Sequence, residues 1–173
     1  VPHRTGSTPA VLFGGGGYDA EDLAGPIKLF YSLEETGPIA PNTLVMGPWR
    51  HGGWSRGDGD ALGNLKFGSK TGEFYRETIE FPFFLEHLKG KGSGLKGPDG
   101  TAAPKAWVFE TGANEWRRFD AWPPKGSREA SLFLLPGGRL GFEPAAGAGS
   151  GEGAFDEYVS DPARPVPVIG QAG

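Results

Sequence analysis

The sequence contains no cysteine, which excludes a disulfide framework, a thiolate zinc site and a cysteine nucleophile. It has no excess of basic residues, because 17 lysines and arginines stand against 21 acidic residues for a formal net charge of −4. A nucleic-acid partner requires a basic face, so we expect no such partner. The apolar runs are short, such as residues 10–13. A helix that crosses a bilayer needs about 20 apolar residues, so we also expect no membrane association.

Glycine and proline, by contrast, are abundant, with 31 and 16 residues, which indicates many tight turns. Aromatic residues make up 12% of the chain and argue against disorder. We therefore expect a loop-rich globular protein. The chain begins Val1-Pro2-His3 without a signal-peptide pattern and ends on a strand-like stretch over residues 165–170. We expect a fragment that is cut at both ends.

Two short apolar runs flank an amphipathic segment in the first fifty residues. Residues 11–13 and 43–46 have the length and composition of buried strands, and glycines follow both. Between them Ile27, Phe30 and Leu33 recur at helical spacing. Two strands joined through a helix form a βαβ unit, which predicts a parallel sheet.

The next part of the chain changes character twice. Residues 50–72 are polar and glycine-rich without periodicity, which predicts a long functional loop. A helical pattern over residues 73–89 follows, in which Pro82 should introduce a kink and Gly90 should end the helix. Residues 89–100 are rich in glycine, lysine and serine and form the best candidate domain boundary.

After this linker the pattern becomes that of an all-β protein. Short strands are predicted over residues 106–109, 115–119 and 131–135, and a hairpin turn over residues 136–138. Regularly spaced short strands are typical of a sandwich or jelly roll. We therefore expect the C-terminal part of an α/β domain over residues 1–100 and part of a jelly-roll β domain over residues 101–173.

Three motif-like stretches do not support cofactor or metal binding. Residues 63–71 resemble a phosphate-binding loop with one residue too many, and no apolar helix start follows them. The glycines at 14–17 lack the spacing of a dinucleotide fingerprint. Residues 58–60 resemble a calcium loop, but Leu62 stands where a third oxygen ligand is needed. We expect no cofactor and no metal.

Asp19 and His51 are the stronger candidates for chemistry, because each follows a predicted parallel strand where open α/β sheets place their sites. In α/β-hydrolase triads an acid precedes the histidine in sequence. The residues alone leave a structural interpretation open. Asp19 could cap a helix, Glu21 and Asp22 could complement a helix dipole, and His51 could lie in a solvated loop.

Two segments, residues 16–23 and 40–51, resemble motifs of the α-amino-acid ester hydrolases. The α-amino-acid ester hydrolases belong with the cocaine esterase-like enzymes and the X-prolyl dipeptidyl peptidases among the serine α/β hydrolases that carry a jelly-roll domain. The resemblance is specific in the G-P-W-x-H and Y-D-x-E-D patterns. It continues, in the family's order, through residues 81–85, 88–92, 121–124 and 158–162.

The resemblance implies a role for each candidate residue. Asp19 would be the triad acid and His51 the general base. Glu21 and Asp22 would belong to a carboxylate cluster that holds the α-ammonium group of the substrate, beside Tyr18 as a further substrate-binding residue. The implied partner is a small-molecule amino-acid ester or amide, and the longer enzyme would be a homo-oligomer that is periplasmic or secreted.

The family's nucleophile lies in a G-x-S-x-G elbow between a strand and a helix, and no serine here is predicted to occupy such an elbow. We therefore expect the nucleophile upstream of Val1 and an isolated chain that is inactive. The leading hypothesis is part of a serine hydrolase that hydrolyses or aminolyses α-amino-acid esters or amides through an acyl-enzyme. A β-lactam acylase, an X-prolyl dipeptidyl peptidase and a non-catalytic β-sandwich binding module over residues 104–173 remain alternatives.

Overall fold

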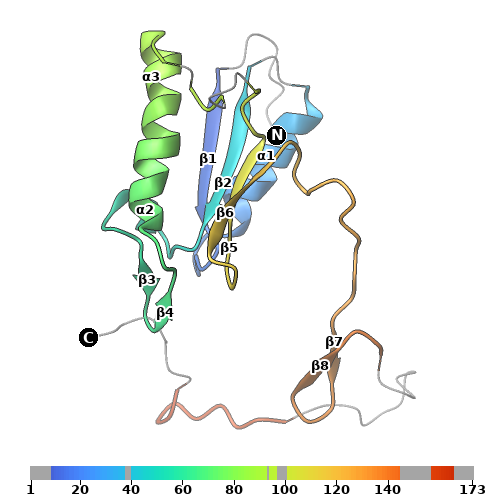
Figure 1. Ribbon diagram of the computed structural model, residues 1–173. Helices are drawn as coiled ribbons and strands as arrows, with labels where there is room; N and C mark the ends of the chain where they lie inside the picture. The colour runs from blue at the N-terminus through green and yellow to red at the C-terminus, as the bar shows by residue number, and fades with distance from the viewer. Residues whose placement is uncertain (1–8, 38–39, 93, 97–100, 145–156, 166–173) are drawn as a thin grey trace. The chain divides into compact units, whose positions relative to one another are not determined.

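The computed structural model describes residues 9–37, 40–92, 94–96, 101–144 and 157–165 (Figure 1). These residues belong to two compact units, one that extends to Lys125 and one that begins at Gly126.

The first unit is built on a four-stranded sheet with the order β1-β2-β5-β6. As predicted, β1 (Val11–Gly16) and β2 (Asn42–Gly47) are parallel, and α1 (Ala24–Glu35) connects them. On its other side β2 pairs in parallel with β5 (Ala106–Glu110), which in turn pairs antiparallel with β6 (Glu115–Phe119). The βαβ unit predicted from the sequence is therefore one half of this sheet.

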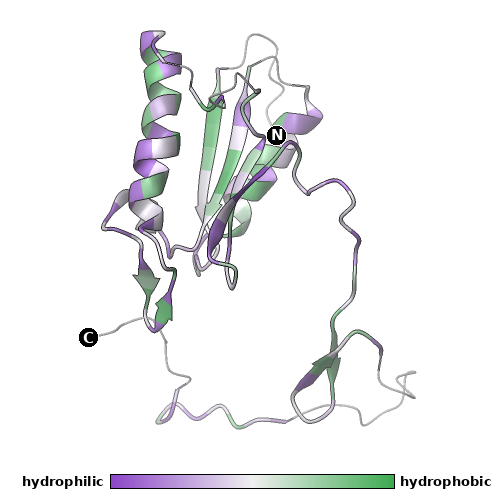
Figure 2. Ribbon diagram, in the orientation of Figure 1, coloured by the Kyte–Doolittle hydropathy of each residue, from purple (hydrophilic) through white to green (hydrophobic). Residues whose placement is uncertain are grey.

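Helices cover both faces of the sheet, and β2 divides its side chains between them. Leu44 and Met46 pack with Phe30 of α1 on one face. Val45, between them in sequence, packs on the other face against the second helical segment. Figure 2 shows apolar residues along β1 and on the helices beside the sheet. This two-sided burial explains the continuous apolar run of β2.

The second helical segment is longer than the sequence predicts and has three parts. It begins with α2 (Thr71–Phe74), continues as a π-helical segment η2 (Tyr75–Glu80) and ends as α3 (Phe81–Lys89). Pro82 cannot donate a hydrogen bond to the preceding turn, and the wider π turn lies directly before it. Gly90 ends the segment with a φ of +63°, as predicted.

The predicted loop over residues 50–72 contains regular structure. It includes a 3₁₀ turn, η1 (Gly53–Ser55), and a small antiparallel hairpin of β3 (Ala61–Leu62) and β4 (Leu65–Lys66). Such short elements carry no hydrophobic periodicity, so the sequence pattern does not show them.

The expected division at residue 100 does not coincide with the boundary between the compact units. Beyond that residue the chain extends the same sheet, since Ala106 and Trp107 pair with Leu44 and Val45 and are buried. The first unit therefore continues to Lys125. Local pattern identifies β5 and β6 as strands but contains no information on which distant strand they join.

The second unit contains a hairpin of β7 (Phe133–Leu135) and β8 (Arg139–Gly141). Its predicted turn is present, with φ of +75° at Gly137 and +69° at Gly138. Within the two described ranges of this unit, residues 126–144 and residues 157–165, there is no further strand. The jelly roll thus stays a prediction, and residues 166–170, expected to be strand-like, lie outside the described part. No helix in the described ranges is long and apolar enough to cross a membrane.

Candidate active site

The loops that carry Asp19 and His51 leave the sheet at the same edge. Gly16 and Gly47, the last residues of β1 and β2, are paired in the parallel register. Beyond them the Gly17 amide donates to the Gly47 carbonyl at 2.7 Å and the Tyr18 amide to the Trp49 carbonyl at 3.1 Å. The two loops are therefore joined by backbone hydrogen bonds before either reaches its candidate side chain.

The glycines at this edge allow the close approach of the two loops. A Cβ atom at Gly16 would lie 2.2 Å from the Trp49 carbonyl oxygen, and one at Gly47 would lie 2.4 Å from the Trp49 ring. Neither contact is sterically possible, so both positions require glycine. This close approach gives a physical reason for the glycines that end β1 and β2.

Asp19 and His51 are in direct contact. His51 Nδ1 lies 2.9 Å from Asp19 Oδ2, and Asp19 Oδ1 accepts the amides of Glu21 at 2.8 Å and Asp22 at 3.0 Å. The Asp19 side chain is 2% exposed, whereas that of His51 is 56% exposed. The carboxylate is thus held by three donors, and the imidazole extends from it toward solvent.

The electrostatics of the pair favour an ionised acid and a basic imidazole. The backbone amide of Asp22 is the largest cause that lowers the pKa of Asp19, and the Glu21 amide and the His51 side chain add to it against desolvation. The hydrogen bond that His51 donates to Asp19, followed by the charge of Asp19 and that of Glu21, raises the pKa of His51. An ionised Asp19 accepts a hydrogen bond from the N–H at Nδ1 of His51, so the Nε2 lone pair of the neutral imidazole points outward.

The structure separates the two acids that follow Asp19. Glu21 Oε2 lies 3.8 Å from His51 Nε2, on a side chain that is 75% exposed. Asp22 instead accepts the amide of Gly25, in the first turn of α1, at 2.8 Å. The sequence left open that both Glu21 and Asp22 complement a helix dipole. In the structure Asp22 is the acid at the start of α1, and Glu21 is the acid beside His51.

A cavity of about 550 Å³ opens at this edge of the sheet. Tyr18, Glu21 and His51 line it together with two residues that sequence analysis missed, Arg50 and Arg56, whereas Asp22 does not. Tyr18 is held by stacking on Phe67, with ring centroids 6.4 Å apart. The only sequence signal for the arginines is their closeness to His51 along the chain.

Comparison with known proteins identifies relatives that match nearly all of this chain. Cocaine esterase of Rhodococcus sp. is 30% identical over 95% of this chain and 27% of its own length. A candidate serine esterase of Mycobacterium bovis is 28% identical over 90% of this chain and 22% of its length. The chain belongs to the cocaine esterase-like family. No protein-family model matches the sequence.

A solved structure also matches nearly all of this chain. The crystal structure of an aminopeptidase from the marine-sediment archaeon Thaumarchaeota archaeon has a TM-score of 0.68 and 40% sequence identity to this chain. The match covers 90% of this chain and 23% of the archaeal one. The chain thus spans about a quarter of the length of the relatives it matches.

Ser55 has to be considered as a candidate nucleophile in this cocaine esterase-like chain. The letters G-x-S-x-G occur at residues 53–57, which sequence analysis overlooked within the predicted loop. The structure places Ser55 at the end of the 3₁₀ turn η1, after the His51 loop instead of after a strand. Its hydroxyl donates to the Gly52 carbonyl at 2.9 Å. Ser55 therefore does not occupy a nucleophile elbow.

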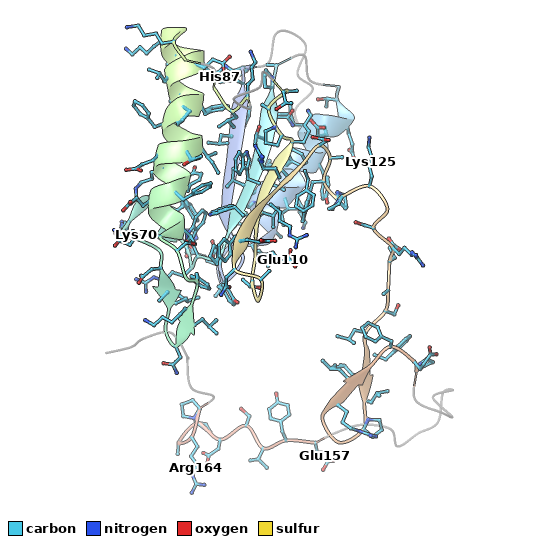
Figure 3. The ribbon with its side chains drawn as sticks, viewed as in Figure 1. Lys70, His87, Glu110, Lys125, Glu157 and Arg164 are labelled. Atoms are coloured by element: carbon cyan, nitrogen blue, oxygen red, sulfur yellow. The ribbon has the colours of Figure 1, made fainter. Side chains whose placement is uncertain are left out.

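The other two histidines differ in position from His51. His87 is exposed on α3 and contacts the Phe83 ring, with centroids 4.6 Å apart. Figure 3 shows His87 and Lys70 toward opposite ends of the second helical segment. His3 lies outside the described residues. Of the described histidines, His51 alone contacts a buried carboxylate.

Proposed function

We propose that this chain is part of a longer serine hydrolase, called the parent enzyme below, and that it supplies the acid and the general base. The contact between His51 Nδ1 and the buried Asp19 carboxylate carries this proposal. It supports a neutral imidazole with an outward-facing Nε2, which is the form a general base requires. The nucleophilic serine would come from residues outside this chain.

The reaction follows from these roles. His51 Nε2 takes the proton of the serine hydroxyl while the serine oxygen attacks the acyl carbonyl. The imidazolium then gives this proton to the departing alcohol or amine as its bond to the acyl carbon breaks. Water then attacks the acyl carbon while His51 takes one of its protons, and the imidazolium returns this proton to the serine oxygen as the ester bond of the acyl-enzyme breaks. Asp19 stays ionised throughout and stabilises the imidazolium.

The proposed substrate is an α-amino-acid ester or amide. Glu21 supports this choice, because its carboxylate lines the cavity beside His51 and would pair with an α-ammonium group. The names of the relatives agree with such a substrate, since one is an esterase and the other an aminopeptidase. The exposed ring of Tyr18 would contact the acyl side chain.

A fluorophosphonate probe tests the proposed chemistry, because it reacts with activated serines. In the parent enzyme we expect it to label one serine outside this chain, and we expect His51→Ala to abolish the labelling. Ser55→Ala should leave the labelling unchanged. Labelling of Ser55, or undiminished labelling of the His51→Ala protein, would contradict the proposed mechanism.

A further inference from the structure

The loop that follows His51 is fixed to the start of the second helical segment through consecutive backbone carbonyls. The Gly59 carbonyl accepts the Thr71 hydroxyl at 2.5 Å, and the Asp58 carbonyl accepts the Gly72 amide at 2.9 Å. Thr71 Oγ1 in turn accepts the indole N–H of Trp49 at 2.8 Å. The first turn of the helix therefore obtains partners for its free donors from this loop.

Arg76 also binds backbone carbonyls of this loop, and these carbonyls lie closer to His51 along the chain than those of Asp58 and Gly59. Its Nη1 donates to the Trp54 carbonyl at 3.1 Å and its Nη2 to the Gly57 carbonyl at 2.9 Å. A guanidinium suits this task because its donors form a planar fork, whereas a lysine is a single point charge. Arg76 lies in the π-helical segment, and a Cβ atom at Gly72 would stand 3.2 Å from Nη1. The absence of a side chain at residue 72 leaves room for the fork.

Trp54 links this fork to the imidazole. Its ring meets the His51 ring edge to face, with centroids 6.2 Å apart and planes at 70°. The same ring contacts the buried Trp49 at 6.3 Å. The chain turns tightly between Trp49 and Trp54, because the Gly53 amide donates to the Arg50 carbonyl at 2.9 Å. His51 is thus bounded by Asp19 at Nδ1 and by Trp54 at the ring, and Arg76 holds the backbone of Trp54.

We propose that Arg76 is a positioning residue for His51, an inference that rests on the proposed function. Arg76 does not line the cavity, so it would act through Trp54 and not on the substrate. Without the fork, residues 54–57 lose two of their anchors, and Trp54 no longer holds the imidazole in line with the serine. A displacement of about 1 Å in a catalytic group is enough to reduce turnover about 100-fold.

The test compares Arg76→Ala and Arg76→Lys in the parent enzyme. We expect Arg76→Ala to lower kcat by at least about tenfold and to change KM by less than about threefold, because binding groups stay in place. Added guanidinium ion should restore part of kcat by occupying the vacated site. The kcat of Arg76→Lys should fall between that of Arg76→Ala and that of the unsubstituted enzyme, since an ammonium reaches one carbonyl and not both.

Arg117→Ala is the matched control. Arg117 on β6 is also a half-exposed arginine, but it pairs with Glu110 and Glu115 instead of with the loop after His51. It should keep kcat and show no response to guanidinium. If Arg76→Ala does not fold, the kcat of Arg76→Lys decides. Unchanged kcat in the folded Arg76 variants, or a loss that guanidinium does not relieve, would overturn the positioning role.

The same set separates this inference from the proposed function. If His51→Ala retains activity, the proposed base is wrong whatever Arg76 does. If His51→Ala is inactive while both Arg76 variants keep kcat, the positioning role alone is wrong.

Discussion

The Tyr18 amide donates a hydrogen bond of 3.1 Å to the Trp49 carbonyl, and this bond joins the loop of Asp19 to the loop of His51. Each of these two residues stands one or two positions before a member of the candidate pair. The geometry between acid and imidazole is therefore set by backbone at the edge of the sheet as well as by the side chains themselves.

This arrangement predicts a strong effect of Gly16→Ala. The new Cβ would lie 2.2 Å from the Trp49 carbonyl oxygen, so the two loops would have to separate. We expect a loss of unfolding free energy of about 1–3 kcal/mol, the usual cost of overpacking, measured by urea denaturation of the parent enzyme. Gly17→Ala is the control, because its Cβ would meet only the Gly47 carbonyl at 3.5 Å. Equal stability of the two variants would contradict this account of how closely the two loops approach each other.

Much of the first unit can be predicted from the sequence because its signals are local. Buried strands, glycine at their ends and helical periodicity identify β1, α1 and β2, and these place Asp19 and His51 at one edge. The pairing of β5 with β2 cannot be predicted in this way. It joins Leu44 to Ala106 across more than sixty residues, and no local pattern records the partner.

The finer organisation of the site also depends on tertiary contacts. Glu21 and Asp22 are adjacent acids with the same apparent role in the sequence, and only the direction of each side chain separates them. Arg76 has backbone carbonyls as partners, and any residue can supply a carbonyl. Its role therefore leaves no mark in the sequence pattern.

Glu21→Gln tests the proposed substrate class. The change keeps the size of the side chain and removes the charge that would pair with an α-ammonium group. For esters with a free α-amino group we expect kcat/KM to fall at least about tenfold, or about 1.4 kcal/mol. Matched esters that lack the amine should be affected little. An equal loss on both substrates would show that Glu21 serves the fold or the Asp19 loop.

Asp22 should behave differently from its neighbour, because its carboxylate accepts the Gly25 amide at the start of α1. Asp22→Ala should cost about 0.5–2 kcal/mol of unfolding free energy, and Asp22→Asn, which can still accept the Gly25 amide, should cost much less. Both variants should keep the preference for α-amino esters. Loss of that preference in a stable Asp22→Asn protein would return Asp22 to the substrate site.

The pH dependence of kcat/KM should report the environment of His51. Asp19 and Glu21 raise the pKa of His51, so the neutral base forms only above its ordinary value of 6.5. We expect an acid limb with its midpoint above that value, measured with an ester that lacks an amine. Glu21→Gln removes a negative charge near Nε2 and should move the midpoint to lower pH. Asp120→Asn, an exposed acid after β6, should not move it. A midpoint that rises in Glu21→Gln would contradict the assignment.

The most direct test of the central claim is the turnover of His51→Ala beside His87→Ala in the parent enzyme, with the fold of both variants checked by circular dichroism. A general base acts as a unit with its nucleophile, so His51→Ala should lower kcat by about three orders of magnitude or more. His87 is exposed on α3, where its ring packs against the Phe83 ring, so its replacement should leave kcat nearly unchanged. Near-normal turnover by folded His51→Ala, or an equal loss in His87→Ala, would contradict the claim that His51 with Asp19 forms the acid–base pair.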